Sequence, residues 1–206
     1  MLSSPSGGGK STIARHLLEA RENVAYSVSA TTRPRRPAEE DGRHYHFLDR
    51  AAFERNIAAG ELIEWAEYGG NLYGTLRSEV EQALAAGRHV VLDIDVAGAR
   101  QVRRQYPDSV HVFVLPPSAA TLVQRLRNRN TEDRDGVGTR MAIAAGELEA
   151  VGEYDYVVIN DDFVEAVAHL AAILDVEERR VSRLINLNQV VESIRRELAD
   201  LTAARE

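Results

Sequence analysis

The chain has 206 residues, of which 44% are hydrophobic, and its formal net charge is −7 with a sequence pI near 5.5. This length suits one α/β domain with an inserted subdomain and is too short for two large independent domains. The acidic balance argues against a protein that binds nucleic acid or an acidic membrane through a basic surface. The chain has no cysteine, which excludes disulfides and thiolate metal sites, and we expect a cytoplasmic protein without a signal peptide or a membrane span.

A glycine-rich stretch near the N-terminus predicts a phosphate-binding loop. It consists of Ser4, Pro5, Ser6, Gly7, Gly8, Gly9, Lys10, Ser11 and Thr12. Consecutive glycines let backbone N–H groups surround an anion, and a helix that begins near Lys10 adds its positive end. Lys10 would reach the β- and γ-phosphates of a nucleotide, and the hydroxyl group of Ser11 would complete the shell of a Mg²⁺ ion.

The sequence on the C-terminal side of this loop fits the usual phosphate-loop pattern, whereas the sequence on its N-terminal side departs from it. The pattern G-x-x-x-x-G-K-[ST] has Ser4 in its first position here. The alternative is a flexible Gly/Ser segment, but Ile13 and Leu17 start an apolar helical stripe that favours a loop followed by a helix. Only Met1 to Ser3 precede the loop, so we expect a short first strand and a lower stability than in a version extended by a short apolar segment.

The next part of the chain predicts a small, partly antiparallel insert. Strands are expected at Val24–Ser29, His44–Leu48, Leu62–Tyr68 and Leu72–Tyr73, and a helix at Arg50–Ala59 with Asp49 as its N-cap. Two prolines stiffen the segment that follows the first of these strands, where Arg33, Arg35 and Arg36 either face a small anion or form a solvated charged surface. The region differs from the strand-helix repeat on either side of it.

Strands and helices then alternate again, as in a parallel α/β sheet. We expect helices at Ser78–Ala86, after Ser118, at Arg140–Gly152 and at Phe163–Leu174, and strands at Val90–Asp95, Val110–Leu115 and Tyr156–Ile159. The polar segment 127–139 is predicted to form a mobile lid. A second arginine cluster lies in and before it, with the same two interpretations as the first, and consists of Arg125, Arg127, Arg129 and Arg134.

Two carboxylates, Asp93 and Asp95, come at the end of a buried strand. Ligands of open parallel sheets collect at the carboxyl ends of the strands, so either residue could hold the waters of a Mg²⁺ ion or orient an arginine. The alternative is a helix N-cap for the segment that begins at Val96.

The C-terminal segment shows a different periodicity. Apolar residues spaced alternately by three and four positions are Leu184, Leu187, Val191, Ile194, Leu198 and Leu201. This is the a/d pattern of a short coiled coil, which predicts a homodimer through residues 184–201. The alternatives are packing on the chain's own body and a frayed tail, because fewer than three heptads make a short coiled coil.

Several short motifs have the order and spacing of one known family. S-x-S-x-T-T-R-x-x-R begins at Ser27, G-x-x-Y-x-F at Gly42, I-E-W at Ile63, Y-G-[ST] at Tyr73 and L-D-I-D at Leu92. With the glycine-rich loop and the Asn-Asp-Asp turn at 160–162, these motifs make residues 3 to 176 resemble a guanylate kinase. The resemblance implies an α/β P-loop fold of three layers, with a central parallel sheet, a small partly antiparallel insert that binds the nucleoside monophosphate, and a lid.

The resemblance also implies how the chain is divided. The core would comprise residues 1–32, 81–125 and 141–180, and the GMP-binding subdomain would comprise residues 33–80. The lid would be residues 126–140, and residues 181–206 would form a C-terminal amphipathic helical extension beyond the family's own fold.

The implied reaction is the Mg²⁺-dependent transfer of a phosphoryl group from ATP to GMP, with dGMP as a further acceptor, in purine nucleotide metabolism. By resemblance, the GMP-binding residues are Ser29, Arg33, Arg36, Tyr45, Glu64, Tyr73, Thr75 and Asp93. The residues that stabilise charge on the moving phosphoryl group are Lys10, Arg33, Arg125, Arg129 and Arg140. Asp93 and Asp95 would act through Mg²⁺ waters or by orienting Arg33.

Two other functions are the main alternatives. One is a catalytically inactive guanylate-kinase-like scaffold domain that grips a phosphorylated peptide, but such domains commonly lose the loop lysine, whereas Lys10 and Ser11 are present here. The other is a kinase for a different nucleoside monophosphate. Glu64 argues against it, because a carboxylate accepts hydrogen bonds from N1–H and the 2-amino group of guanine, and adenine offers neither donor.

Overall fold

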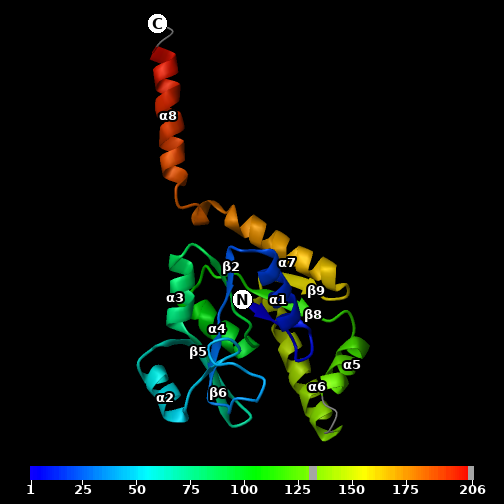
Figure 1. The fold of residues 1–206 in the computed structure, drawn as a ribbon. Helices are drawn as coiled ribbons and strands as arrows, with labels where there is room; N and C mark the ends of the chain where they lie inside the picture. Colours follow the sequence, from blue (N-terminus) through cyan, green and yellow to red (C-terminus); the bar gives the residue numbers. More distant parts are fainter. Residues whose placement is uncertain (130–133, 204–206) are drawn as a thin grey trace. The chain divides into compact units, whose positions relative to one another are not determined.

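The computed structural model describes residues 1–129 and 134–203 of the chain (Figure 1). The chain divides into two compact units, Met1–Val167 and Ala168–Glu206. Across the described residues, no helix has both the length and the apolar character needed to cross a membrane.

A parallel sheet forms the centre of the first unit. Its strands, in spatial order, are β2 (Val24–Tyr26), β7 (His89–Val91), β1 (Leu2–Ser3), β8 (Val112–Leu115) and β9 (Tyr156–Ile159). Leu2 joins the two halves of this sheet, because its N–H donates to the carbonyl of Leu92 at 2.8 Å and its carbonyl accepts from the N–H of Ile94 at 3.2 Å. The predicted central parallel sheet is therefore confirmed, and the first strand is short.

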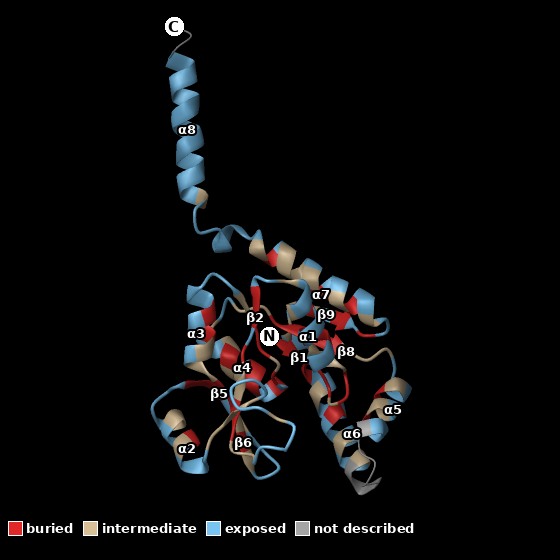
Figure 2. Ribbon diagram, viewed as in Figure 1, coloured by how far each residue is buried: buried red, intermediate tan, exposed pale blue. Residues whose placement is uncertain are grey.

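Helices lie around this sheet and bury apolar residues against its strands or against one another. They are α1 (Lys10–Ala20), α3 (Arg77–Ala85), α4 (Val96–Gln105), α5 (Ala119–Arg129) and α6 (Arg134–Glu149), which continues into the 3₁₀ turn η1 (Ala150–Glu153). Ile13 and Leu17 of α1 are almost completely buried, as is Phe113 of β8. Figure 2 shows the buried residues of the first unit gathered around its central strands.

A second, smaller sheet forms the predicted insert. Its spatial order is β4 (His46–Phe47), β3 (Ser29–Thr31), β6 (Asn71–Leu76) and β5 (Leu62–Tyr68), with β3 and β4 parallel and the other pairs antiparallel. Helix α2 (Arg50–Ala58) packs on it through Phe53, which is fully buried with Ala30, Leu62 and Leu72. Asp49 caps α2 as predicted, since its carboxylate accepts from the N–H of Ala52.

The expected strand Val24–Ser29 is wrong as a single element. The chain changes sheets at Ser27 and Val28: the N–H of Ser27 still donates to Val91 of the central sheet, whereas Ser29 pairs with Thr75 of the insert. Alternation of side chains looks the same whichever sheet a residue joins, so the sequence pattern does not reveal this change. The sheet of the insert thus begins at Ser29, and the division of the chain at residue 33 stays a prediction.

Several other expected elements differ in extent. The strand expected at Val90–Asp95 is β7 followed by residues that pair with Leu2 rather than with β2. The helix expected at Arg140–Gly152 begins earlier, at Arg134, and ends as η1. The expected lid, residues 126–140, includes residues 130–133, which lie outside the described residues.

The second unit consists of helical segments. It contains the end of α7 (Phe163–Glu178), the 3₁₀ turn η2 (Val181–Arg183) and α8 (Leu187–Ala203). The buried carboxylate of Glu177 pairs with Arg180 at 3.3 Å and with Arg183 at 3.2 Å, which fixes η2 to the end of α7. Helix α8 has no buried residue along its described length (Figure 2), and it begins after Leu184, so this first residue of the expected heptad stripe lies outside the helix.

Candidate functional site

The glycine-rich loop connects β1 to α1 and has the backbone conformation that its glycines allow. Gly7 and Gly9 have φ angles of 87° and 92°, in the region that favours glycine. Gly9 is also the N-cap of α1, so the positive end of this helix faces the loop. A cavity of about 240 Å³ lies at the loop and is lined by Ser4, Pro5, Ser6, Gly7, Gly8, Gly9, Lys10, Ser11, Asp93, Asp95 and Glu147. We call it the phosphate cavity.

Side chains from two other elements hold the loop in this shape. Nδ2 of Asn160 donates to the carbonyl oxygen of Gly8 at 2.8 Å, and Arg125 donates to the same oxygen at 3.2 Å. Arg125 also donates to the carbonyl of Asn160 at 3.2 Å. The structure thus places Arg125, a predicted charge stabiliser, beside the phosphate loop.

Lys10 lies between Asp93 and the backbone of the neighbouring strand. Its Nζ is 2.7 Å from Oδ1 of Asp93 and donates to the carbonyl of Ile94 at 2.6 Å. The hydroxyl group of Tyr26 also hydrogen-bonds to Asp93, and burial raises its pKa well above the usual value. Asp93 therefore holds the loop lysine, whereas Arg33 pairs with Glu39, and the role of Asp93 in orienting Arg33 stays a prediction.

Asp95 caps a helix, which was the alternative interpretation of this residue. One of its carboxylate oxygens accepts from the N–H of Gly98 at 2.7 Å, which starts α4. The residue also lines the phosphate cavity, where Ser11 is exposed. Within the described residues, no cluster of three or more His, Asp or Glu side chains is arranged as a metal site.

A larger cavity, of about 390 Å³, adjoins the phosphate cavity. It is lined by Ser6, Ser29, Tyr45, Glu64, Ala66, Tyr68, Tyr73, Gly74, Asp93, Ile94, Asp95, Arg140, Ile143 and Glu147. We call it the acceptor cavity. It shares Ser6, Asp93, Asp95 and Glu147 with the phosphate cavity, and its other walls come from the insert and from α6. Its volume is in the usual range for a small-molecule site.

A buried carboxylate lies at the wall of the acceptor cavity. Glu64 is only 6% exposed, and its Oε1 accepts a hydrogen bond of 2.6 Å from the hydroxyl group of Thr75. Burial raises the pKa of Glu64 to about 7, while the bond from Thr75 partly opposes this rise. Gly98 approaches the carboxylate closely, since a Cβ added there would lie 2.8 Å from Oε2 of Glu64.

The arginine-rich segment is organised by a residue that the sequence analysis did not select. Oε1 of Glu39 is 2.7 Å from Arg33, and its Oε2 accepts from the N–H of Arg36 at 2.8 Å. The bond from Arg33 lowers the pKa of Glu39 to about 2. The guanidinium of Arg33 also lies over the rings of Tyr45 and Phe47, 5.4 and 5.7 Å from their centroids.

The predicted site residues thus fall into three groups. The first group lines one or both cavities. It comprises residues 4–11 of the loop together with Asp93, Asp95, Ser29, Tyr45, Glu64, Tyr73 and Arg140. Thr12, the last loop residue, lines neither cavity. Thr75, Arg33 and Arg125 contact residues of the first group without lining either of these two cavities. The backbone N–H of Arg36 binds Glu39, the partner of Arg33, and the side chain of Arg129 lies outside the described part of the chain.

Glu147 is the other functional candidate that the sequence analysis missed. Its Oε2 accepts from the N–H of Ser6 in the loop at 3.1 Å. The signal that could have found it is its spacing from Arg140, because residues seven apart lie on the same face of a helix. Both side chains line the acceptor cavity.

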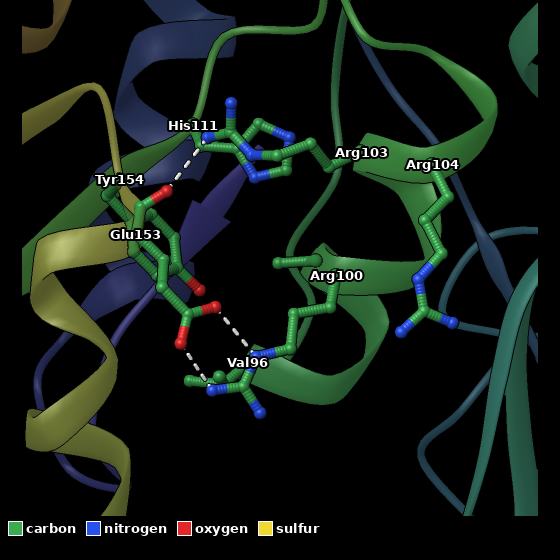
Figure 3. Close-up of a pocket in the computed structure, with 8 residues that line it drawn as sticks. Val96, Arg100, Arg103, Arg104, His111, Glu153 and Tyr154 are labelled. Carbon is green, nitrogen blue, oxygen red and sulfur yellow. Dashed lines mark hydrogen bonds and ion pairs between the residues drawn. The ribbon is translucent and has the colours of Figure 1, made fainter.

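A third hollow, of about 250 Å³, is lined mainly by α4 and η1 (Figure 3). Arg100 donates to Glu153 from two nitrogens, and Arg103 pairs with Asp155 at 3.2 Å. Figure 3 shows the carboxylate of Glu153 facing Arg100. Because these two arginines are matched by carboxylates of the same chain, the hollow has the character of a structural clamp between α4 and η1.

Comparison with known proteins agrees with this geometry. The family model described as "Guanylate kinase" matches residues 1–177. A guanylate kinase of Symbiobacterium thermophilum is 50% identical over 183 residues, which cover 89% of this chain and 87% of the relative. One from Nitrobacter hamburgensis is 47% identical over 199 residues, which cover 96% of this chain and 91% of the relative.

A solved structure gives the same result. The crystal structure of guanylate kinase from Anaplasma phagocytophilum superposes with a TM-score of 0.75 at 36% sequence identity, over 93% of this chain and 92% of the other. Since the family model and the relatives both span most of the sequence, this chain belongs to the guanylate kinase family.

Proposed function

We propose that this chain transfers the γ-phosphoryl group of ATP to GMP or dGMP, giving ADP and GDP or dGDP, with the acceptor in the acceptor cavity and ATP on the glycine-rich loop. The observation that carries this assignment is the buried Glu64–Thr75 pair in a cavity that adjoins the phosphate cavity. The alternative of an inactive scaffold domain is not favoured, because Lys10 and Ser11 both line the phosphate cavity.

Glu64 reads the guanine base. Its ionised carboxylate accepts from N1–H and from the 2-amino group, and Ser29 and Thr75, which are partners in the pairing of β3 with β6, also contact the base. With adenine, the buried carboxylate would face a lone pair and would keep only the hydrogen bond from Thr75. Leaving a buried charged group unpaired costs about 2 kcal/mol or more, which corresponds to a preference of at least about thirtyfold.

The phosphate of GMP is bound by Arg33, Arg36, Tyr45 and Tyr73, with Asp93 nearby. Arginine and phenolic hydroxyl groups are suitable donors to a phosphate dianion. Tyr45 and Tyr73 support this assignment because both line the acceptor cavity and their ring centroids are 6.2 Å apart. Arg33 lies over the ring of Tyr45, so it can reach the same phosphate.

The protein's part in the chemical step is alignment and charge. Residues 4–12 bind the phosphates of ATP, and Lys10, Arg33, Arg125, Arg129 and Arg140 supply positive charge around the moving phosphoryl group. Lys10 already lies at the phosphate cavity, but it is paired with Asp93. It must therefore exchange this carboxylate for a phosphate oxygen when ATP binds.

The residues at the phosphate cavity fit a Mg²⁺ ion held mainly by phosphate oxygens and water. Ser11 would bind it directly, and Asp93 and Asp95 would bind it through water. Asp93 is engaged by Lys10 and by the hydroxyl group of Tyr26. One oxygen of Asp95 accepts from the N–H of Gly98, and its other oxygen can accept from water. When bound, the ion would neutralise charge on the transferred phosphate.

The proposal also covers the setting in which the enzyme works. We place it in the cytoplasm, in GMP recycling and purine nucleotide metabolism, with ATP and GMP as its partners and without a nucleic acid or a membrane. The a/d stripe of α8 supports a homodimer, because Leu187, Val191, Ile194, Leu198 and Leu201 lie on one helix without a buried residue.

An ADP-release assay tests the function. Mg²⁺-ATP is offered with GMP, dGMP, AMP, CMP or UMP in parallel, and Lys10→Ala is the blank. We expect turnover with GMP far above turnover with AMP, and its loss in the blank. Absence of turnover with every acceptor would contradict the kinase assignment and favour the scaffold, whereas a preference for AMP would contradict the role of Glu64.

Sedimentation of the full chain and of Ile194→Asp tests the dimer.

A further inference from the structure

The side chain of Glu147, a residue far from the phosphate loop in the sequence, forms a hydrogen bond with the loop. It comes from α6, and its Oε2 accepts a hydrogen bond of 3.1 Å from the backbone N–H of Ser6. The residue is half-buried and lines both the phosphate cavity and the acceptor cavity. It is therefore an anionic group of the chain itself at the place where the loop binds anions.

The chemistry of this contact resembles that of a bound phosphate oxygen. Backbone N–H groups of a glycine-rich loop form stronger hydrogen bonds with charged acceptors than with neutral ones. The ionisable groups that act on Glu147 are Lys10, which attracts it, and Asp95, which repels it. Burial raises the pKa of Glu147, as expected for a carboxylate removed from water.

We propose that the carboxylate of Glu147 is an internal ligand of the phosphate loop, which the phosphates of the nucleotide must displace in order to bind. This inference rests on the proposed role of residues 4–12 as the ATP site. The N–H of Ser6 cannot bind Glu147 and a phosphate oxygen at full strength together, and the like charges of the two acceptors repel each other.

The displacement also gives α6 a direct link to the state of the loop. Arg140 lies seven residues before Glu147 on the same helix face, and both side chains line the acceptor cavity. While Glu147 binds Ser6, this hydrogen bond connects α6 to the empty loop. When a phosphate replaces the carboxylate, the hydrogen bond is lost, and the part of α6 that carries Arg140 can change its position as the substrates bind.

Binding of inorganic tripolyphosphate to the full chain tests this competition. Calorimetry at about pH 8 with a chelator present keeps carboxyl groups ionised and removes metal effects. We expect Glu147→Gln, which keeps the size of the side chain but loses its charge, to bind tripolyphosphate about tenfold more tightly than the unmodified chain. That change corresponds to about 1.4 kcal/mol.

Glu149→Gln is the matched control, because Glu149 lies on the same helix and is exposed. Its affinity should stay within about twofold of the unmodified chain, since exposed charges are screened. Unchanged or weaker binding by Glu147→Gln would overturn the proposal, and so would equal gains in both variants, which would indicate general electrostatics. A role of Glu147 as a structural support or a metal ligand predicts no gain in metal-free affinity.

The ADP-release assay separates this inference from the proposed function. If the unmodified chain phosphorylates GMP but Glu147→Gln shows no gain in affinity, only the internal ligand is wrong. If the chain neither phosphorylates GMP nor binds tripolyphosphate in any variant, the assignment of the loop is wrong, and this inference is overturned with it.

Discussion

Thr75 donates a hydrogen bond of 2.6 Å to the carboxylate of Glu64, and these two residues are also direct partners in the pairing of β6 with β5. The register of that pair shifts between Leu62 and Glu64. Ile63 packs in the core with Val80 and Leu92, whereas Glu64 lines the acceptor cavity. Because successive side chains of a strand point to opposite faces, a core residue and a residue of the candidate site are neighbours in the sequence.

The pKa of Glu64 predicts a cost in stability. In the folded chain it is about 7 instead of 4.5, so between these values the folded state binds more protons than the unfolded state, and stability falls as pH rises. Glu64→Gln removes this effect and keeps the acceptor for Thr75. We expect its free energy of unfolding to exceed that of the unmodified chain by about 2 to 3 kcal/mol at about pH 8 and to match it near pH 4.

Urea unfolding at the two pH values measures this difference. Exposed Glu67→Gln, on the same strand, is the control and should show little change at either pH. An equal effect of Glu64→Gln at both pH values would contradict a raised pKa.

The same carboxylate predicts a pH dependence of GMP binding. Glu64 must be ionised to accept from guanine, so below about pH 7 it must lose a proton when GMP binds. The other charged groups that act on it are Asp95 and Lys10. We expect the KM for GMP to rise about tenfold per pH unit below this value.

The phosphate of GMP also titrates in this range, with a pKa of about 6. Glu64→Gln is therefore the reference, because the phosphate contributes equally to both proteins. The ratio of the two KM values should depend on pH, and a constant ratio would show that Glu64 does not titrate in the free enzyme.

The close approach of Gly98 to Glu64 predicts that a side chain at position 98 would weaken the recognition of GMP. A Cβ at this position would lie 2.8 Å from Oε2 and 3.3 Å from the carboxylate carbon of Glu64, so the carboxylate must move. We expect Gly98→Ala to lower kcat/KM for GMP at least about tenfold, because a displacement of 1 Å weakens both hydrogen bonds to the base. Turnover of AMP should change little.

Gly146→Ala is the matched control, since a Cβ there meets nothing within 4 Å in the described structure. It should keep full activity and gain up to about 1 kcal/mol of stability, as alanine is the better helix former. Equal kinetics of the two alanine variants with GMP would contradict a steric role for Gly98.

The sequence predicts the loop well because its chemistry is local. Gly7 and Gly9 with Lys10 are adjacent in the chain, and their conformation follows from residue type. Motif spacing likewise places Glu64 and Thr75 in one site through the resemblance to guanylate kinases. These features need no knowledge of how distant segments pack.

Contacts between distant segments are the part that the sequence leaves open. Asp93 binds Lys10 across 83 positions, and Glu147 binds Ser6 across 141. Carboxylates of this kind can cap a helix, bind a cation or face solvent with the same local pattern. Asp95 caps a helix because α4 begins directly after it, and the local pattern alone does not distinguish this role from the others.

The contacts of Glu39 predict that the proposed binding site for the GMP phosphate is preformed in the free protein. The carboxylate of Glu39 pairs with the guanidinium of Arg33 and accepts a hydrogen bond from the backbone N–H of Arg36, and Arg33 in turn lies over Tyr45. Glu39→Gln loses the charge of the first contact, so Arg33 becomes free to adopt other rotamers. We expect the KM for GMP to rise about fivefold to tenfold with the KM for ATP unchanged.

Initial-rate kinetics with each substrate varied in turn measures this change. Glu40→Gln is the control, because Glu40 is exposed and pairs with the exposed Arg43. A change in the KM for ATP as large as that for GMP would mean that Glu39 supports the fold of the insert rather than the geometry of Arg33.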